Sequence, residues 1–342
     1  MNYEKIHVYD YLRNSKIAFV LVRNSIRKHI LNEIKLKYGN KRKYAHEILK
    51  ISANTLDSEL YNNKYLKFDR LLKIIGTLGI STPIFYDYII SFYAKGSNTC
   101  KEIVLPRELE INEFFVEGYA LYLAEGDNGS NGKTLPRKVR FSNSELAVHK
   151  RFINWLNTYF PNNDFYFNVM IPYPKILTQE HRNHIVSYIN LDERQLKVKT
   201  YKWKRKTGFV YKTCLDSALL IDFILAVENK VKELCLQDGK LAAAYIRGMM
   251  IGEGTAYFNK SRYVRIEMKN EKEIKYLHEL FVLLGYDCKP TLRTTRSNMW
   301  SLLIGAKQLK KYYEEIGFGI HEKRQKILEK AANKVLKVNQ YC

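Results

Sequence analysis

The sequence predicts an α+β protein in which a small all-α domain precedes two copies of one α+β module. A repeat predicts the duplication: GYALYLAEGDNGS, from Gly118, and AYIRGMMIGEGTAYF, from Ala244, are apolar runs rich in small residues, and each contains Glu-Gly. Each run is followed by a basic segment of alternating residues and then by a helical pattern. The two Glu-Gly pairs are one domain length apart, so we divide the chain into residues 1–105, 106–238 and 239–342.

The N-terminal region is predicted to be helical and to contain a helix-turn-helix. Residues 41–49 (KRKYAHEIL) and 53–61 show two short helical patterns separated by residues 50–52, which are the proportions of that motif. A following helix around residues 71–78 would close its core. An ordinary small helical bundle is the alternative. Residues 95–108, with Gly, Ser and Pro, are predicted to be the linker.

Within each copy the hydrophobic period changes from helix to strand and back, which predicts the order helix, two strands, helix, strands, helix. In the first copy, residues 138–142 are predicted to form a strand and residues 196–212 (LKVKTYKWKRKTGFVYK) a β-hairpin. In the second copy, the corresponding strands are residues 263–267 and 289–303. A final helix is expected at residues 321–337, after the turn IGFGI.

The charge of the chain indicates its partner. It has 57 Lys+Arg against 35 Asp+Glu, a net charge of +22, which attracts polyanions such as nucleic acids. No run approaches the ~18 apolar residues of a membrane span, and the N-terminus lacks the pattern of a signal peptide. Five cysteines without CxxC spacing argue against a disulfide scaffold or a zinc ribbon. The protein is therefore expected to be cytoplasmic, to bind nucleic acid and to make no membrane contact.

The repeated motif carries the predicted chemistry. Small residues four apart lie on one helix face and let two helices approach closely. Glycine inside a helix costs about 0.8–1 kcal/mol relative to alanine, and a close helix contact compensates for that cost. The residues of the predicted helix interface are Ala120, Ala124, Gly248 and Gly252. If the two helices pack in parallel, the glutamates at their ends, Glu125 and Glu253, meet.

Two carboxylates at adjoining helix C-termini are costly, because they oppose the helix dipoles and repel each other. A divalent cation removes both penalties, and the hard oxygen ligands suit Mg²⁺, with Mn²⁺ as the alternative. A metal between two acids can activate water for phosphodiester hydrolysis. The other interpretation is that each Glu-Gly is an ordinary helix end with a glycine cap.

GYALYLAEG and IRGMMIGEG resemble the two copies of the motif that defines the LAGLIDADG homing endonucleases. The similarity covers about residues 112–337. The acid that binds the catalytic metal in that family falls on Glu125 and Glu253, and the small residues of the family's helix interface fall on the four interface positions. The sixth motif position, often acidic in the family, is Leu123 and Ile251 here. The N-terminal region more loosely resembles repressor-type helix-turn-helix domains.

The resemblance implies that each half has the order αββαββα and that two sheets form a saddle over duplex DNA. The implied metal site comprises Glu125, Glu253, Ala124 and Gly252. A basic residue is also implied near the closing turn IGFGI. Lys323 is the nearest candidate for this catalytic role, and His321 and Arg324 are its rivals. The first copy has no clear counterpart.

Basic residues on the predicted strands are the candidates for DNA contact, because Lys and Arg bind phosphates and guanine edges. They are Lys138, Arg140, Lys197, Lys199, Lys202, Lys204 and Lys206 in the first copy, and Arg262, Arg265, Arg293 and Arg296 in the second. For any single basic strand, a solvated surface is the alternative.

The motif and the resemblance together predict a monomeric, divalent-metal-dependent endonuclease that cuts double-stranded DNA at a long asymmetric site. One alternative is a transcription regulator that has lost cleavage, because some proteins combine this fold with a helix-turn-helix. A second is a maturase that binds intron RNA, which charge does not distinguish from DNA. Two opposed glutamates favour the nuclease, since a regulator does not need them.

Overall fold

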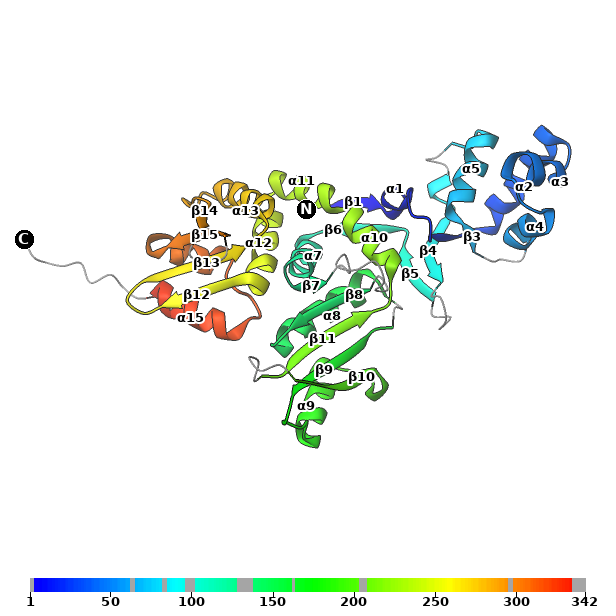
Figure 1. Cartoon of the computed structure of the whole chain (residues 1–342). Coiled ribbons are helices and arrows are strands. Elements are labelled where there is room, and N and C mark those ends of the chain that lie inside the picture. Colours follow the sequence, from blue (N-terminus) through cyan, green and yellow to red (C-terminus); the bar gives the residue numbers. More distant parts are fainter. Residues whose placement is uncertain are drawn as a thin grey trace, which may run out of the picture.

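The structure, a computed structural model, describes residues 3–61, 65–81, 85–95, 102–127, 138–161, 164–202, 208–294 and 298–333. An N-terminal unit, a first half and a second half follow one another along the chain (Figure 1). The two halves meet where helices α7 and α12 lie side by side. Within the described ranges, no helix combines the length and the apolar character needed to cross a bilayer.

The N-terminal unit contains both helices and strands. Its elements are β1 (Glu4–His7), α1 (Val8–Leu12), β2 (Phe19–Val22), α2 (Asn24–Tyr38), α3 (Lys41–Lys43), the π-helical segment η1 (Tyr44–Leu49), α4 (Ala53–Tyr61), β3 (Leu66–Lys67), α5 (Phe68–Leu78), β4 (Ile89–Lys95) and β5 (Glu102–Pro106). Segment η1 and helix α4 flank a turn in which Lys50 has a φ of 59°. Both short helices of the predicted helix-turn-helix are therefore present.

The prediction of an all-α N-terminal domain is wrong. Strands β3, β2, β4 and β5 form a four-stranded sheet in that order. FVLV in β2 and IISFYAK in β4 are rich in β-branched and aromatic residues, which suit a half-buried sheet. Strand β2 pairs with β3 and β4, which lie far from it in the chain, so no local pattern revealed these pairings. Strands β4 and β5 are close in the chain, but the Gly, Ser and Pro between and within them were interpreted as a linker. Strand β5 also lies within the predicted linker at residues 95–108, and it pairs with β4.

The N-terminal unit is attached to the first half by strand pairing and by side-chain contacts. Strand β1 pairs antiparallel with β6 (Glu108–Ile111). The Ser15 hydroxyl donates to Asp222, 3.2 Å away, and the Tyr11 ring packs against Phe223 at 6.1 Å between centroids. The first residues of the chain are thus part of the framework that supports the first half.

The first half is a five-stranded sheet with helices on one face. Its elements are α7 (Glu113–Glu125), β7 (Gly126–Asp127), β8 (Val139–Asn143), α8 (Leu146–Tyr159), β9 (Tyr166–Pro172), α9 (Gln179–Ile189), a short 3₁₀ turn (Glu193–Gln195), β10 (Leu196–Tyr201), β11 (Val210–Leu215), α10 (Ala218–Ala226) and α11 (Glu228–Gln237). The strand order is β10-β9-β11-β8-β7. This half therefore adds α9, β10 and a second helix at its end, α11, to the expected order αββαββα.

The prediction of a β-hairpin at residues 196–212 is also wrong. Strands β10 and β11 are both formed, but β9 lies between them: β10 pairs parallel with β9, and β11 pairs antiparallel with β9 and β8. The sequence of β9, YFNVMIP, is mostly apolar and largely buried, which favours a central place in the sheet. The mostly exposed β10 takes the edge.

The second half follows the predicted order of elements, with one additional short helix. Its elements are α12 (Gly239–Glu253), β12 (Gly254–Phe258), β13 (Arg262–Met268), α13 (Glu271–Leu283), β14 (Thr291–Arg293), β15 (Met299–Gly305), a 3₁₀ turn (Ala306–Gln308), α14 (Leu309–Glu315) and α15 (Glu322–Asn333). The strand order is β12-β13-β15-β14. Both halves thus start with a helix that ends in Glu-Gly and continues directly into a strand, which confirms the α+β fold and the duplicated module.

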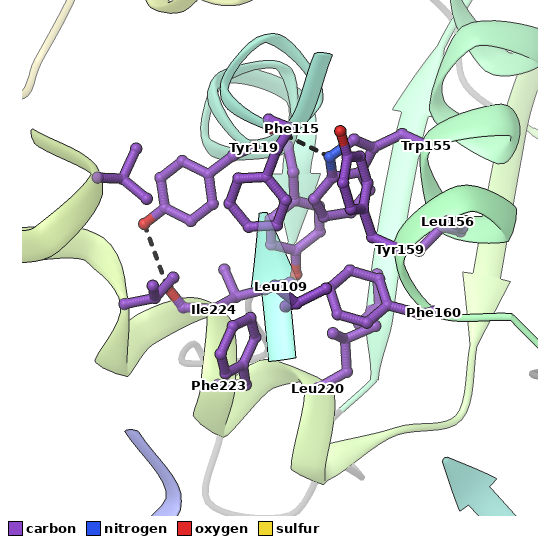
Figure 2. Close-up of a cluster of buried hydrophobic side chains, with 14 of the residues drawn as sticks. Leu109, Phe115, Tyr119, Trp155, Leu156, Tyr159, Phe160, Leu220, Phe223 and Ile224 are labelled. Atoms are coloured by element: carbon purple, nitrogen blue, oxygen red, sulfur yellow. Dashed lines mark hydrogen bonds between the residues drawn. The ribbon is translucent and has the colours of Figure 1, made fainter. Parts of the chain in front are cut away.

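Aromatic residues form the core of the first half (Figure 2). Trp155 from α8 is fully buried, and its indole N–H donates to the Phe115 carbonyl at 3.0 Å. The Tyr119 hydroxyl donates to the Ile224 carbonyl at 3.1 Å. Helix α7 is thereby fixed to α8 on one side and to α10 on the other. This packing holds the helix that ends in Glu125.

Candidate active site at two helix ends

Helices α7 and α12 begin at side-chain caps and end in the same way. The Asn112 side chain accepts from the Phe115 N–H at the start of α7, and the Asp238 side chain accepts from the Lys240 N–H at the start of α12. Both ends pass directly into a strand, with Gly126 and Gly254 in extended conformation. A glycine cap would need a positive φ, so the capping interpretation does not account for these glycines.

Close approach of the chain to itself accounts for Gly126 and Gly254. A Cβ atom at Gly126 would lie 2.3 Å from the Tyr122 carbonyl oxygen, and one at Gly254 would lie 2.6 Å from the Met250 carbonyl oxygen. No side chain fits at these distances. The sharp exit from helix to strand therefore requires glycine after each glutamate, and it sets both glutamates at the helix ends.

The four predicted interface residues lie between α7 and α12. A Cβ at Gly248 would lie 2.3 Å from the Glu117 carbonyl oxygen and 2.8 Å from Ala120 Cβ. One at Gly252 would lie 2.5 Å from Ala124 Cβ and 3.0 Å from Glu125 Cγ. The two backbones thus approach as closely as glycine allows, and the residue before Glu253 touches Glu125.

A buried ion pair crosses the same interface. Glu117 of α7 is 4% exposed. It binds Arg151 of α8 at 2.7 Å and Arg247 of α12 at 3.1 Å. Removing either partner of a buried pair is strongly destabilising, so this cluster favours one register of α12 along α7.

A chain of buried hydrogen bonds reaches Glu125 from the first-half sheet. The Asn143 amide donates to Glu125 Oε1 at 2.9 Å. The Asn143 backbone N–H contacts His149 Nε2 at 3.2 Å, and His149 Nδ1 contacts the Thr213 hydroxyl at 2.9 Å. Burial lowers the pKa of His149 to about 4, so the ring is neutral at physiological pH. Asn143 is therefore held in place to orient Glu125, a role that the sequence alone did not reveal.

Arg324 of α15 lies at the end of α12, close to both glutamates. Its guanidinium donates to the carbonyl oxygens of Met250, Ile251 and Gly252, at 3.1, 2.6 and 3.0 Å. Burial lowers the pKa of Arg324, and the charges of Glu125 and Glu253 oppose that shift. Desolvation raises the pKa of Glu253, and Arg324 opposes it. Arg324 thus offsets the negative end of the helix dipole as well as the two carboxylates.

The other two candidates for the basic residue occupy different positions. Lys323 is 76% exposed and donates to Glu145 at 2.7 Å. His321 is buried, and burial lowers its pKa to about 4. Among the three neighbours, Arg324 is the one whose charge acts on both glutamates.

The donor set fits a divalent cation that keeps water or phosphate ligands. Glu125 and Glu253 supply hard carboxylate oxygens at adjoining helix ends, as Mg²⁺ prefers. In the described part of the chain, no three His, Cys, Asp or Glu side chains gather as a metal site. Ala124 and Gly252 could add only carbonyl oxygens, and the Gly252 carbonyl already accepts from Arg324. The end of α7 therefore offers more protein oxygen atoms to a metal than the end of α12 does.

The predicted DNA-contact residues fall into three groups. Lys204, Lys206 and Arg296 lie outside the described residues. Arg262 donates to the Ala331 carbonyl of α15 at 2.9 Å, on the side of the sheet that faces this helix. The remaining residues lie on β8, β10, β13 and β14 or next to the ends of these strands, and Arg140 and Arg265 alternate with buried residues of β8 and β13.

Several of these basic residues are paired with acids. In the first half, Lys138 binds Asp216 at 2.7 Å and Arg140 binds Asp127 at 3.2 Å. In the second half, Glu267 binds both Arg265 and Arg293. Glu267 is a residue that the sequence prediction missed. Strand alternation places it on the same face as Arg265 and was the available signal.

Comparison with known proteins agrees with the repeated motif. Residues 240–317 match the family model described as a LAGLIDADG-like domain. This match confirms the resemblance to the LAGLIDADG family and identifies a LAGLIDADG-like domain in the second half. A search of curated proteins finds no match.

Three solved structures illustrate the likeness. I-DmoI in complex with DNA and Mn is 15% identical, with 61% of this chain and 98% of that chain covered and a TM-score of 0.35. The N-terminal LAGLIDADG domain of DUF199/WhiA is 15% identical, with coverage of 60% and 82% and a TM-score of 0.36. The homing endonuclease I-WcaI bound to its DNA recognition sequence is 9% identical, with coverage of 60% and 81% and a TM-score of 0.37. Likeness at this level carries no conclusion about activity.

Proposed function

We propose that the protein is a site-specific endonuclease that cuts both strands of DNA at a long asymmetric site with the help of a divalent cation. The observation that carries the proposal is the close packing of α7 and α12 through glycine and alanine up to the glutamate that ends each helix, with Gly252, the residue before Glu253, lying against Glu125. Such a pair of charges is costly without a bound cation. Strands with basic residues on their open faces continue from each half of this site.

In this proposal, each residue of the site has a separate task. Glu125 and Glu253 hold the cation, Mg²⁺ or Mn²⁺, which when bound would help to activate water and to stabilise the leaving oxygen. Asn143 orients Glu125 through its 2.9 Å hydrogen bond. Arg324, rather than Lys323, supplies positive charge beside the glutamates. Carrying both halves on one chain makes the monomer the proposed active form.

The decisive experiment is a cleavage selection on a library of randomised duplex DNA. It compares Mg²⁺, Ca²⁺ and the variant that carries both Glu125→Gln and Glu253→Gln. Products that need Mg²⁺, share one long asymmetric sequence and are absent with the variant would establish the endonuclease. Equal cleavage by wild type and variant would refute the role of the two glutamates.

A DNA-binding regulator without cleavage is the second candidate, and one observation favours it. Arg324 already offsets the charge at the end of α12 and occupies the Gly252 carbonyl, so the glutamate pair is tolerated in part without a metal. In the same selection, a regulator would enrich one sequence as bound, uncut DNA under every condition.

A further inference from the structure

The sheet of the N-terminal unit has one buried face. A row of side chains that crosses all four strands is fully buried. Its members are Leu66, Val20, Phe92 and Leu105. The Phe92 ring packs edge-on against Phe68 of α5, with 5.3 Å between the ring centroids. Because side chains alternate along a strand, the next row of residues points to the opposite face of the sheet.

The opposite face carries aromatic side chains where a solvated sheet face usually carries polar ones. Its row, again one residue from each strand, is half-buried and consists of Lys67, Phe19, Tyr93 and Val104. Tyr65, which directly precedes β3, lies over the same face, because its ring centroid is 3.9 Å from that of Tyr93, with 34° between the ring planes. We define the aromatic face as Phe19, Tyr65 and Tyr93.

The rings of the aromatic face are arranged as unpaired nucleic-acid bases require. Phe19 and Tyr93 are direct partners on adjacent antiparallel strands, and the β-carbons of such partners lie about 4.5–5.5 Å apart. Aromatic side chains on neighbouring strands of a four-stranded sheet can stack on the flat faces of successive bases. In a duplex these flat faces are covered by the neighbouring base pairs. The aromatic face therefore suits single strands rather than duplex DNA.

The surroundings of the aromatic face are basic. Residues 1–105 contain twice as many Lys and Arg residues as Asp and Glu residues. Lys67 lies in the same row as Phe19, and the exposed Arg23 directly follows β2. Lys67 contacts Asp69 at 3.2 Å, but both side chains are exposed, so this ion pair is weak. The charge therefore complements the phosphates of a strand whose bases stack on the rings.

A second copy of this chain is the other occupant that an exposed aromatic surface suggests. A stable protein interface buries about 800 Å² on each partner. An aromatic side chain contributes roughly 150–250 Å² when it passes from full exposure to burial, and the three rings of the aromatic face are already half-buried. Charged residues are also depleted at the centre of protein interfaces, whereas Lys67 is the direct strand partner of Phe19. Both observations favour nucleic acid.

We propose that the aromatic face of the N-terminal unit binds the unpaired bases of single-stranded nucleic acid. Phe19, Tyr65 and Tyr93 stack on the bases, and Arg23 and Lys67 contact the phosphates. The sheet lies apart from α7 and α12 (Figure 1), so this binding is additional to the proposed cleavage and does not depend on it. DNA and RNA strands share the flat base faces that the rings recognise, and the experiment distinguishes the two sources.

The test compares oligothymidylate with an abasic strand of the same length and charge, each of about ten nucleotides, by fluorescence anisotropy with the full chain. The ratio of the two affinities separates the contribution of the bases from that of the phosphates. Oligouridylate of equal length tests RNA.

The main variant carries Phe19→Leu and Tyr93→Leu, which keep apolar side chains in the sheet and remove two rings. Tyr65→Leu, outside the strands, is a second variant whose effect does not require a change within the sheet. The matched control carries Tyr257→Leu and Tyr263→Leu, which remove a pair of rings stacked at 5.0 Å on the second-half sheet. Thermal unfolding checks that each variant remains folded.

We expect the wild type to bind oligothymidylate more tightly than the abasic strand, and each lost ring to lower this preference by about fivefold or more. The control and Tyr93→Phe, which keeps the ring, should retain the preference. If the variants also weaken binding of oligouridylate, the tighter of the two strands identifies the source of the bases.

Equal affinity of the wild type for strands with and without bases would overturn the inference, and so would an equal loss in the control. Dimerisation of the wild type that the main variant abolishes, without a preference for bases, would assign the aromatic face to a second copy of the chain. Base-dependent binding by a protein that cuts no duplex would refute the proposed function and leave this inference intact.

Discussion

At the scale of single residues, orientation of the carboxylates depends on groups whose own positions are fixed. The Asn143 amide can donate to only a few places, because its backbone is tied to buried His149 and its side-chain oxygen accepts from the Glu145 N–H at 2.9 Å. The imidazole of His149 is buried and neutral, so its protonation state does not change near physiological pH. The geometry of Glu125 is thus insensitive to moderate changes in pH.

Asn143→Ala should therefore slow cleavage and leave DNA binding nearly unchanged. Loss of a hydrogen-bonding partner behind a metal ligand typically costs about 10–100-fold in metal affinity or activity. Single-turnover cleavage at saturating protein, measured across Mg²⁺ concentrations, would separate weaker metal binding from slower chemistry. Wild-type rates at every Mg²⁺ concentration would show that Asn143 has no positioning role.

The raised pKa of Glu253 makes a second prediction, about stability. Burial raises this pKa above its ordinary value of 4.5, so the native state binds the proton more tightly than the unfolded chain does. Stability then decreases as the pH rises from about the ordinary value through the raised one. Glu253→Gln removes the charge, and it should raise the melting temperature at neutral pH and weaken this decrease.

The measurement is thermal unfolding in EDTA between pH 4.5 and neutral pH. Glu329→Gln on the exposed side of α15 is the control, and we expect it to leave the profile unchanged. If the melting temperature of Glu253→Gln depends on pH as that of the wild type does, the charged Glu253 carboxylate does not destabilise the native state.

At the scale of elements, the contact between α7 and α12 is limited by backbone atoms rather than by flexible side chains. A carbonyl oxygen and an alanine Cβ face Gly248, and neither can rotate away. The sequence predicted this contact because small residues at helical spacing occur in both copies of the motif. A local pattern sufficed here, since each helix carries its half of the interface.

Gly248→Ala should destabilise the protein by about 1–3 kcal/mol, as overpacking in a close-packed interior does. The matched control is Gly76→Ala in α5, where a Cβ meets nothing within 4 Å. There the higher helix propensity of alanine should stabilise by up to about 1 kcal/mol. Urea unfolding measures the change in the free energy of unfolding for both variants. Equal changes would mean that the backbones at the α7–α12 contact move apart enough to accommodate the added methyl group.

Strand order was harder to predict than the elements themselves. The alternation in residues 196–212 correctly indicated strands. Alternation shows on which face of a sheet each side chain lies, but it does not show which strand lies next to which. The partner of β10 was decided by buried β9, about thirty residues earlier in the chain. Arg324 shows the same limit on a helix: successive residues point about 100° apart, so the sequence did not reveal which of Lys323 and Arg324 faces the glutamates.

At the scale of the whole molecule, DNA affinity is proposed to be distributed over three units. The N-terminal unit adds a basic segment at α3, the start of the first helix of the predicted helix-turn-helix, whereas α4 itself contains no Lys or Arg. Phosphate contacts from this unit would therefore come from α3 more than from α4. Deleting the unit is a poor test, because it would remove β1 from its pairing with β6.

Substitution of Arg42 and Lys43 by alanine is the cleaner test of this contribution. Both side chains are exposed. We expect affinity to fall several-fold and the salt slope to decrease by about 1–2, since each lost phosphate contact removes about 0.9. The cleavage rate at saturating protein should stay constant. The control variant replaces the exposed Lys272 and Lys310 of the second half by alanine, which removes the same charge. Affinity that is unchanged relative to this control would assign the N-terminal unit a task other than DNA contact.

The helix contact at the centre of the molecule also sets the time at which the site first exists in a growing chain. Glu125 leaves the ribosome early, but the surface on which it rests belongs to α12, and the guanidinium beside it belongs to α15. Synthesis proceeds from the N-terminus at about 5–20 residues per second, so a nascent chain spends many seconds with one half folded and the glutamate pair unassembled. Any activity that needs both glutamates is thereby withheld until α15 has been made, without a separate inhibitor.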